Sequence, residues 1–150
     1  MLRDVSDVRS LVFLAAILGL ETLVVINFNN VPTLLLPLLL FVLMVAVFIA
    51  TLINHNHRHL PMFHAPWANR LLNGALTIAM GAPSTRLHAV HMLNHHKHYR
   101  TTDDWSHYSL AGSRRGLLRT LTYYKNATMR MGLNRKTLEL TPEAGRELRI

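Results

Sequence analysis

The 150-residue sequence contains no cysteine, which excludes disulfide bonds, thiolate nucleophiles and metal or iron–sulfur sites held by thiolates. It contains 10 histidines against 8 aspartates and glutamates, so any metal ion would be bound mainly by imidazole. Its length predicts one domain or part of one. A hydrophobic content of 50% excludes a disordered chain, and with a net charge of +8 it fits either a small basic globule or a membrane protein.

Charge is scarce in the first third of the chain and abundant afterwards. Residues 1–54 hold 2 basic and 3 acidic residues, a net charge of −1, and residues 55–150 hold the other 14 basic and 5 acidic residues, a net charge of +9. Hydrocarbon excludes charge and anionic headgroups attract basic residues. This division is typical of a membrane protein.

Two apolar runs predict a transmembrane helical hairpin. Residues 31–53 contain no charged residue and are long enough to cross a bilayer, and residues 10–28 form a second run interrupted only by Glu21. A buried soluble helix and a signal peptide are the alternatives, and both fit less well. We expect Pro37 to kink the second helix. The short connector carries no Lys or Arg, so the positive-inside rule places both ends of the hairpin in the cytoplasm and predicts a multi-pass integral membrane protein.

The rest of the chain predicts shorter helices, which makes the fold class all-α. Residues 71–82 are apolar but too short to span, and we expect them to be interfacial or re-entrant. Residues 109–150 form a basic cytoplasmic tail, with a helix start signal at 141–143. Within this tail a row of apolar residues at helical spacing on a basic background fits either a membrane-surface helix or ordinary core packing: Leu117, Leu118, Leu121 and Tyr124.

Nine of the ten histidines lie between His55 and His98, and eight of them form two clusters. In the first, His55 and His59 share a face if the helix continues, and His57 points away. In the second, four histidines at steps of three, four and three would form one stripe on a helix, with His96 beside it: His88, His91, His95 and His98. Grouped imidazoles without cysteine favour iron, zinc, copper or nickel over calcium or magnesium. A nucleic-acid site is disfavoured, because phosphate contact requires neither a membrane anchor nor clustered imidazoles.

Residues 30–108 resemble the membrane fatty acid desaturase family and its hydroxylase relatives, which carry histidine boxes on the cytoplasmic side of a helical membrane bundle. His55-x-x-x-His59 matches the first box and His91-x-x-x-His95-His96 the second. The 36-residue step between the boxes, the intervening segment and an acidic pair after the second box, Asp103 and Asp104, are also similar to the family.

The resemblance implies a non-haem di-iron centre that uses O₂ to oxidise or desaturate a lipid acyl chain, with electrons from a ferredoxin or small cytochrome. Transferred residue by residue, it implies five iron ligands: His55, His59, His91, His95 and His96. His57, His88 and His98 match no box position and would be either supporting or surface residues. Asp103 and Asp104 would either orient ligating imidazoles or form a solvated turn.

The chain departs from the family in its third box. The family builds its site with about eight histidines, including a box after a second membrane hairpin, whereas only His107 follows His98 here. We therefore expect residues 1–150 to be a single partial domain, with spans at 10–28 and 31–53, a box region at 54–108 and the tail at 109–150. A truncated or split chain is favoured over completion by a second subunit or a degenerate paralogue. The alternative functions are a membrane metal-handling protein without redox catalysis and an inactive remnant acting as an interaction module.

Overall fold

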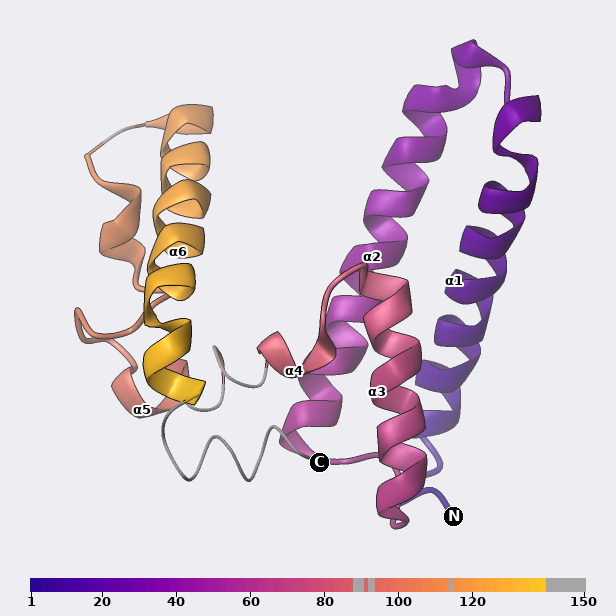
Figure 1. Ribbon diagram of the computed structural model, residues 1–150, viewed down its shortest axis with the longest axis horizontal. Coiled ribbons are helices and arrows are strands. Elements are labelled where there is room, and N and C mark those ends of the chain that lie inside the picture. Colours follow the sequence, from indigo (N-terminus) through magenta and orange to yellow (C-terminus); the bar gives the residue numbers. More distant parts are fainter. Residues whose placement is uncertain (88–90, 92–93, 114, 140–150) are drawn as a thin grey trace. The chain divides into compact units, whose positions relative to one another are not determined.

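The computed structural model describes residues 1–87, 91, 94–113 and 115–139, and these residues form helices joined by short turns (Figure 1). An isolated bridge pairs Leu2 with Phe63, and no strand occurs in the described ranges. The predicted all-α fold is confirmed. The chain divides into two compact units, Met1–Ser84 and Thr85–Ile150, and each is treated on its own below. His88 and the helix start predicted at 141–143 lie outside the described residues.

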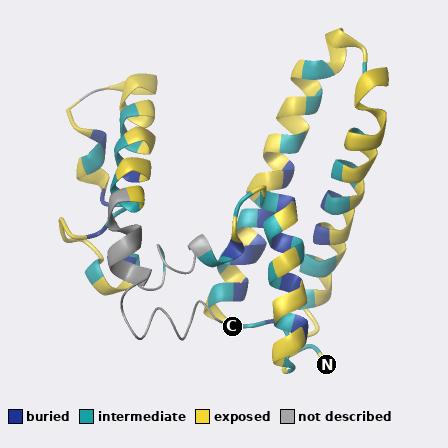
Figure 2. Cartoon of the chain, in the orientation of Figure 1, coloured by how far each residue is buried: buried dark blue, intermediate teal, exposed yellow. Residues whose placement is uncertain are grey.

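Two long apolar helices dominate the first unit, α1 (Asp7–Asn27) and α2 (Leu36–His59). Two 3₁₀ turns join them, Phe28–Asn30 and Thr33–Leu35. Both helices are long and apolar enough to cross a membrane, and only 11% and 17% of their most apolar windows are buried (Figure 2). A core helix of a soluble protein would be mostly buried, so the outward apolar faces favour contact with lipid.

The second helix differs from the prediction at both of its ends. Pro37 lies in the first turn of α2, where its missing N–H leaves no hydrogen bond unmade, so the predicted kink is wrong. The helix continues to His59, six residues beyond the predicted span. The first histidine cluster is therefore helical.

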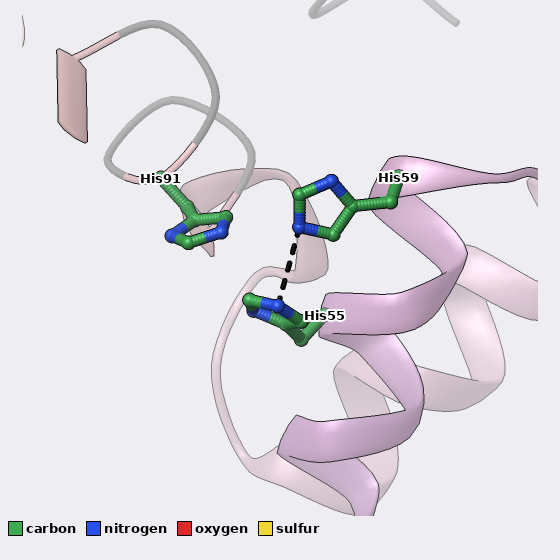
Figure 3. Close-up of side chains that lie close together, drawn as sticks. All are labelled: His55, His59 and His91. Atoms are coloured by element: carbon green, nitrogen blue, oxygen red, sulfur yellow. Dashed lines mark hydrogen bonds between the residues drawn. The ribbon is translucent and has the colours of Figure 1, made fainter. Parts of the chain in front are cut away.

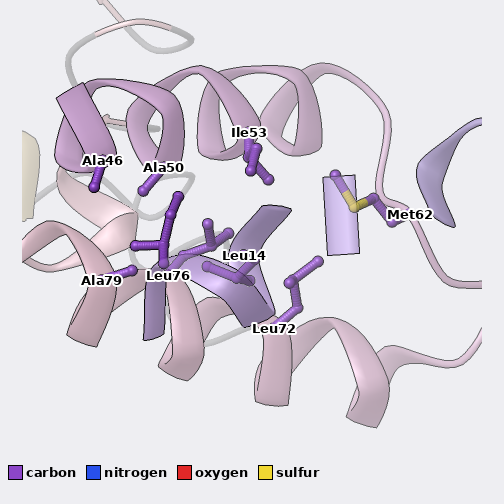
Figure 4. Packing of buried hydrophobic residues seen from close by; sticks show 9 residues of the cluster. Leu14, Ala46, Ala50, Ile53, Met62, Leu72, Leu76 and Ala79 are labelled. Atoms are coloured by element: carbon purple, nitrogen blue, oxygen red, sulfur yellow. The ribbon is translucent and has the colours of Figure 1, made fainter. Parts of the chain in front are cut away.

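The core of the first unit lies where α3 (Pro66–Met80) packs on α1 and α2. Ala46 and Ala50 of α2 are buried four residues apart, and such small side chains let another helix approach closely. Leu76 of α3 is completely buried against this group (Figure 4). Gly81 ends α3 with a left-handed φ of 61°, and α4 (Ser84–Leu87) follows. These contacts fix the end of α2 that carries the first histidines.

The second unit contains α5 (His96–His98), a 3₁₀ turn at Tyr108–Ala111 and α6 (Gly116–Glu139). The long helix α6 packs along the 3₁₀ turn. Its start, at Gly116, has a φ of 56°. The predicted helical spacing of Leu117, Leu118, Leu121 and Tyr124 is thus confirmed, and these side chains are exposed rather than part of a core.

Candidate metal centre

The first histidine box lies on the last two turns of α2. His55 and His59 are one helical turn apart, and their Nε2 atoms are 3.2 Å from each other (Figure 3). Their ring centroids lie 4.7 Å apart. Figure 3 also draws His91, which belongs to the second unit. The conditional prediction that His55 and His59 share a face holds, because the helix continues through both residues.

His57 points to the interior of the first unit and has a structural role. Its side chain is 3% exposed, and its Nδ1 accepts a hydrogen bond of 3.2 Å from the Met62 backbone N–H. With Nδ1 acting as acceptor, the neutral ring carries its proton on Nε2. His57 therefore fixes the turn that follows α2 and is not placed as a ligand beside His55 and His59.

A polar network ties the box-carrying end of α2 to α3 and to the start of α4. Asn54 is fully buried and donates to the Ser84 carbonyl at 3.1 Å. Arg58 Nη2 donates to Asn73 Oδ1 at 2.6 Å and to Ser84 Oγ at 2.9 Å, and its Nε donates to Asn54 Oδ1 at 3.3 Å. Because buried polar groups are costly when unpaired, this network fixes the rotation of the last turn of α2. These residues belong to no motif that the sequence displays.

The second box has a wider helical geometry than the regular helix that the 3-4-3 spacing predicts. His91, Asn94 and His95 lie in π-helical turns, whose hydrogen bonds run from residue i to i+5. This geometry brings the Nε2 atoms of His91 and His96 to within 3.1 Å, and the His91 and His95 rings stack with centroids 5.3 Å apart. All three predicted ligands of this box are thus neighbours within the second unit.

His95 is oriented by Asp104. Its Nδ1 lies 2.8 Å from Asp104 Oδ2 and 2.9 Å from Ser106 Oγ. The Ser106 N–H and hydroxyl donate to Asp104 Oδ1 at 2.8 and 2.7 Å. Burial raises the pKa of the Asp104 carboxyl, but the hydrogen bonds from Ser106 and His95 outweigh this effect and hold the pKa below its usual value. Asp104 therefore accepts a proton-bearing Nδ1 and leaves the Nε2 lone pair of His95 for a ligand.

Of the acidic pair considered in the sequence analysis, Asp104 has the orienting role. Asp104 is 2% exposed, whereas Asp103 is exposed and contributes its main-chain carbonyl, which accepts from Asn94 Nδ2 at 3.1 Å. Asn94 Oδ1 also accepts the Trp105 N–H at 2.7 Å. The buried Asn94 thus attaches the box to the turn that carries Asp104. The only sequence feature that could have pointed to Asn94 is its position directly before His95.

The donor set fits a metal bound by imidazole. Two imidazole nitrogens about 2.1 Å from one ion lie about 3.0 Å apart at a right angle and about 3.4 Å apart at the tetrahedral angle. The separations within the two pairs, 3.2 Å for His55 and His59 and 3.1 Å for His91 and His96, fall between these limits. Each pair can therefore chelate one ion with little movement.

Each unit contains a cavity that could be compared with the positions of the histidines. A polar cavity of about 490 Å³ in the second unit is lined by His95, Tyr99, Arg100, Asp104, Ser106, His107 and Tyr108. An apolar groove of about 500 Å³ runs between α1 and α2 beside their connector, and its lining ends at Val42. Since His55 is 13 residues further along α2, or about 20 Å, the groove is not where chemistry at His55 would occur.

The helical units with their paired histidines, and two helices apolar enough to cross a membrane, define a histidine-rich membrane protein. The family model for fatty acid desaturases matches residues 31–146. The chain therefore belongs to the membrane fatty acid desaturase family, whose members are generally di-iron dependent and act on lipid acyl chains in membranes. No curated protein and no solved structure matches the chain.

Proposed function

We propose that this chain supplies two histidine boxes of a desaturase-type di-iron centre, at which O₂ oxidises or desaturates a lipid acyl chain. The proposed ligands are His55, His59, His91, His95 and His96. The observation that carries the proposal is the chelating separation within each pair, 3.2 Å in the first box and 3.1 Å in the second. Family membership supports the same chemistry.

The chain's own residues hold the ligand atoms in place. A bound iron pair would supply the activation of O₂ that removal of hydrogen from an unactivated C–H bond requires. Asp104 keeps the proton of His95 on Nδ1, and the network of Arg58 fixes the face of α2 that carries His55. Imidazole suits oxidative chemistry, because thiolate ligands would themselves be oxidised.

The charge distribution supports the proposed membrane placement. We propose that α1 and α2 span the bilayer with both ends in the cytoplasm, because their connector contains no Lys or Arg and the chain after residue 54 has a net charge of +9. Histidines at the cytoplasmic end of α2 would then lie beside the headgroups, within reach of an acyl chain. A basic cytoplasmic face would also attract an acidic ferredoxin or small cytochrome as electron donor.

The five proposed ligands are fewer than the about eight that the family uses. We propose that a third histidine box, from further polypeptide or from another subunit, completes the centre. The test is the iron content of the detergent-purified 150-residue chain, alone and co-expressed with a polypeptide that carries such a box. We expect two irons per completed complex and O₂-dependent lipid oxidation.

A matched pair of variants makes the test specific. His95→Ala should lose iron and oxidation, whereas His98→Ala, in the same segment but at no box position, should retain both. Absence of iron under both expression conditions would overturn the proposal. Reversible zinc or nickel binding of similar strength without a preference for iron, measured by competition dialysis, would instead support a metal-handling protein.

A further inference from the structure

The helix α6 has one face that is fixed to its own unit. Tyr123 donates its hydroxyl hydrogen to the Ser106 carbonyl at 2.9 Å, and Asn126 Nδ2 donates to the Leu110 carbonyl at 2.8 Å. Ala127, the residue after Asn126, is buried, and Arg130 contacts the Thr102 carbonyl. This face therefore holds α6 against the segment that follows the second histidine box.

The remaining face of α6 carries a row of exposed apolar side chains. Leu117, Leu121 and Tyr124 follow steps of four and three, so they share one side of the helix, with Leu118 at its border. Their exposed fractions range from 56% to 73%. Single exposed leucines are common, but four large apolar residues within two turns form a continuous surface.

Every Lys, Arg, Asp or Glu position in the segment around this row is occupied by a basic residue. Residues 105–138 contain seven Lys and Arg and no Asp or Glu: Arg114, Arg115, Arg119, Lys125, Arg130, Arg135 and Lys136. Of these, Arg115, Arg119 and Lys125 are exposed. Lys125 follows Leu121 by four residues and shares its side, Arg115 directly precedes α6, and Arg119 lies on the other side of the helix. The charge complementarity requires an anionic partner, and the leucines require one that also offers hydrocarbon.

We propose that this face of α6, formed by Leu117, Leu121 and Tyr124 with Lys125 beside them, docks on the anionic headgroup region of a lipid bilayer. The leucines enter the boundary between headgroups and acyl chains, and Lys125 contacts lipid phosphates and carboxylates, while the other basic residues of the segment add to the attraction. An acidic protein would match the charges and would leave the leucines without an apolar partner. The inference is independent of the proposed oxidation chemistry, since it concerns neither the histidines nor a metal.

The absence of cysteine permits a direct test on the full chain. Leu121→Cys places a single thiol on the proposed face, and Thr122→Cys places one on the adjacent half-buried residue, rotated by about 100° around the helix and at neither three- nor four-residue spacing from the three residues that share that face. Each variant is labelled with an environment-sensitive fluorophore and reconstituted into phosphatidylcholine vesicles with or without phosphatidylserine. The measurements are the emission shift and the quenching by brominated lipids, and Leu117→Cys repeats the test at a second position.

We expect the labels at 117 and 121 to shift to shorter wavelength and to be quenched by brominated lipid, more strongly with phosphatidylserine, while the label at 122 is not quenched. Replacing Arg115, Arg119 and Lys125 together by glutamine should abolish the preference for phosphatidylserine, and added salt should weaken it. Equal emission shift and equal quenching at 121 and 122 in both lipids would overturn the proposal. Protection of residue 121 only on addition of an acidic electron donor would do the same.

Discussion

The hydrogen bonds of Asp104 lead to a sharp prediction for Asp104→Asn. The two carboxylate oxygens accept from three donors, Ser106 N–H, Ser106 Oγ–H and His95 Nδ1–H. An asparagine has one acceptor oxygen and one donor amide at the same place. If its oxygen faces Ser106, its NH₂ faces His95, and Nδ1 must become an acceptor. The imidazole proton then moves to Nε2, the atom that would bind a metal.

The expected loss of metal affinity is 10- to 100-fold, the usual effect of removing the partner that orients a ligating histidine. This range corresponds to about 1.4–2.7 kcal/mol at 25 °C. The assay is equilibrium binding of Co²⁺ to the detergent-purified chain, by competition with a chromophoric chelator, together with the cobalt absorption spectrum. A changed spectrum would report that His95 has left the coordination sphere.

The matched control is Asp103→Asn, which removes the same charge one residue away. Asp103 is exposed and contributes through its main-chain carbonyl, so its substitution should leave the affinity within about twofold of wild type. Thermal unfolding followed by circular dichroism separates loss of folded protein from loss of affinity. Equal affinities in the two variants, with an unchanged spectrum, would refute the argument that Asp104 sets the tautomer of His95.

Three further predictions test the structure of the first unit. Gly81→Ala should lower the free energy of unfolding by about 1 kcal/mol, because φ is 61° there. Gly74→Ala lies inside α3 with open space around the added Cβ, and it should raise the free energy of unfolding by about 0.5–1 kcal/mol. Denaturant titrations that show a change of the same sign for both variants would contradict this. Leu76→Ala should cost about 2–5 kcal/mol in the same titrations, since the side chain is completely buried, and a cost below about 1 kcal/mol would argue against the packing of α3. His57→Ala should lower the melting temperature and preserve Co²⁺ affinity. His59→Ala should lower the Co²⁺ affinity and leave the melting temperature unchanged. Loss of Co²⁺ binding in His57→Ala, at a temperature where this variant remains folded, would identify His57 as a metal ligand.

The two long apolar helices could be predicted because they depend on local sequence. A run of 23 residues without charge predicts a helix whatever its neighbours are. The end of α2 could not be predicted in the same way. The helix continues to His59 because Asn54, His57 and Arg58 find partners on segments up to 30 residues away. Such tertiary hydrogen bonds leave no periodic signal in the sequence.

The same reason applies to the geometry of the second box. The spacing of its histidines fits a regular α-helix, which would turn His91 and His96 about 140° apart. The structure has π-helical turns at His91 and His95 instead. Asn94 and His95 are held by the 103–106 turn, through contacts to Trp105 and Asp104. The first contact joins a side chain to the backbone, and the second joins two side chains. From the sequence alone, only the Asp104 carboxylate could be suggested as a partner of a box histidine.

The two boxes share one anchoring device, although they lie in different units. In each box an asparagine directly precedes a proposed ligand, Asn54 before His55 and Asn94 before His95, and each asparagine is almost completely buried at 0% and 4% exposure. Each donates through Nδ2 to the main-chain carbonyl of a later segment, at 3.1 Å in both cases. A buried amide that loses such a partner costs about 1–3 kcal/mol, so rotation of either box about its axis is strongly resisted. Because neighbouring side chains on a helix point in different directions, an asparagine fixed toward the interior holds the next histidine toward a more accessible side. The orientation of the ligand atoms is thus set before any metal binds.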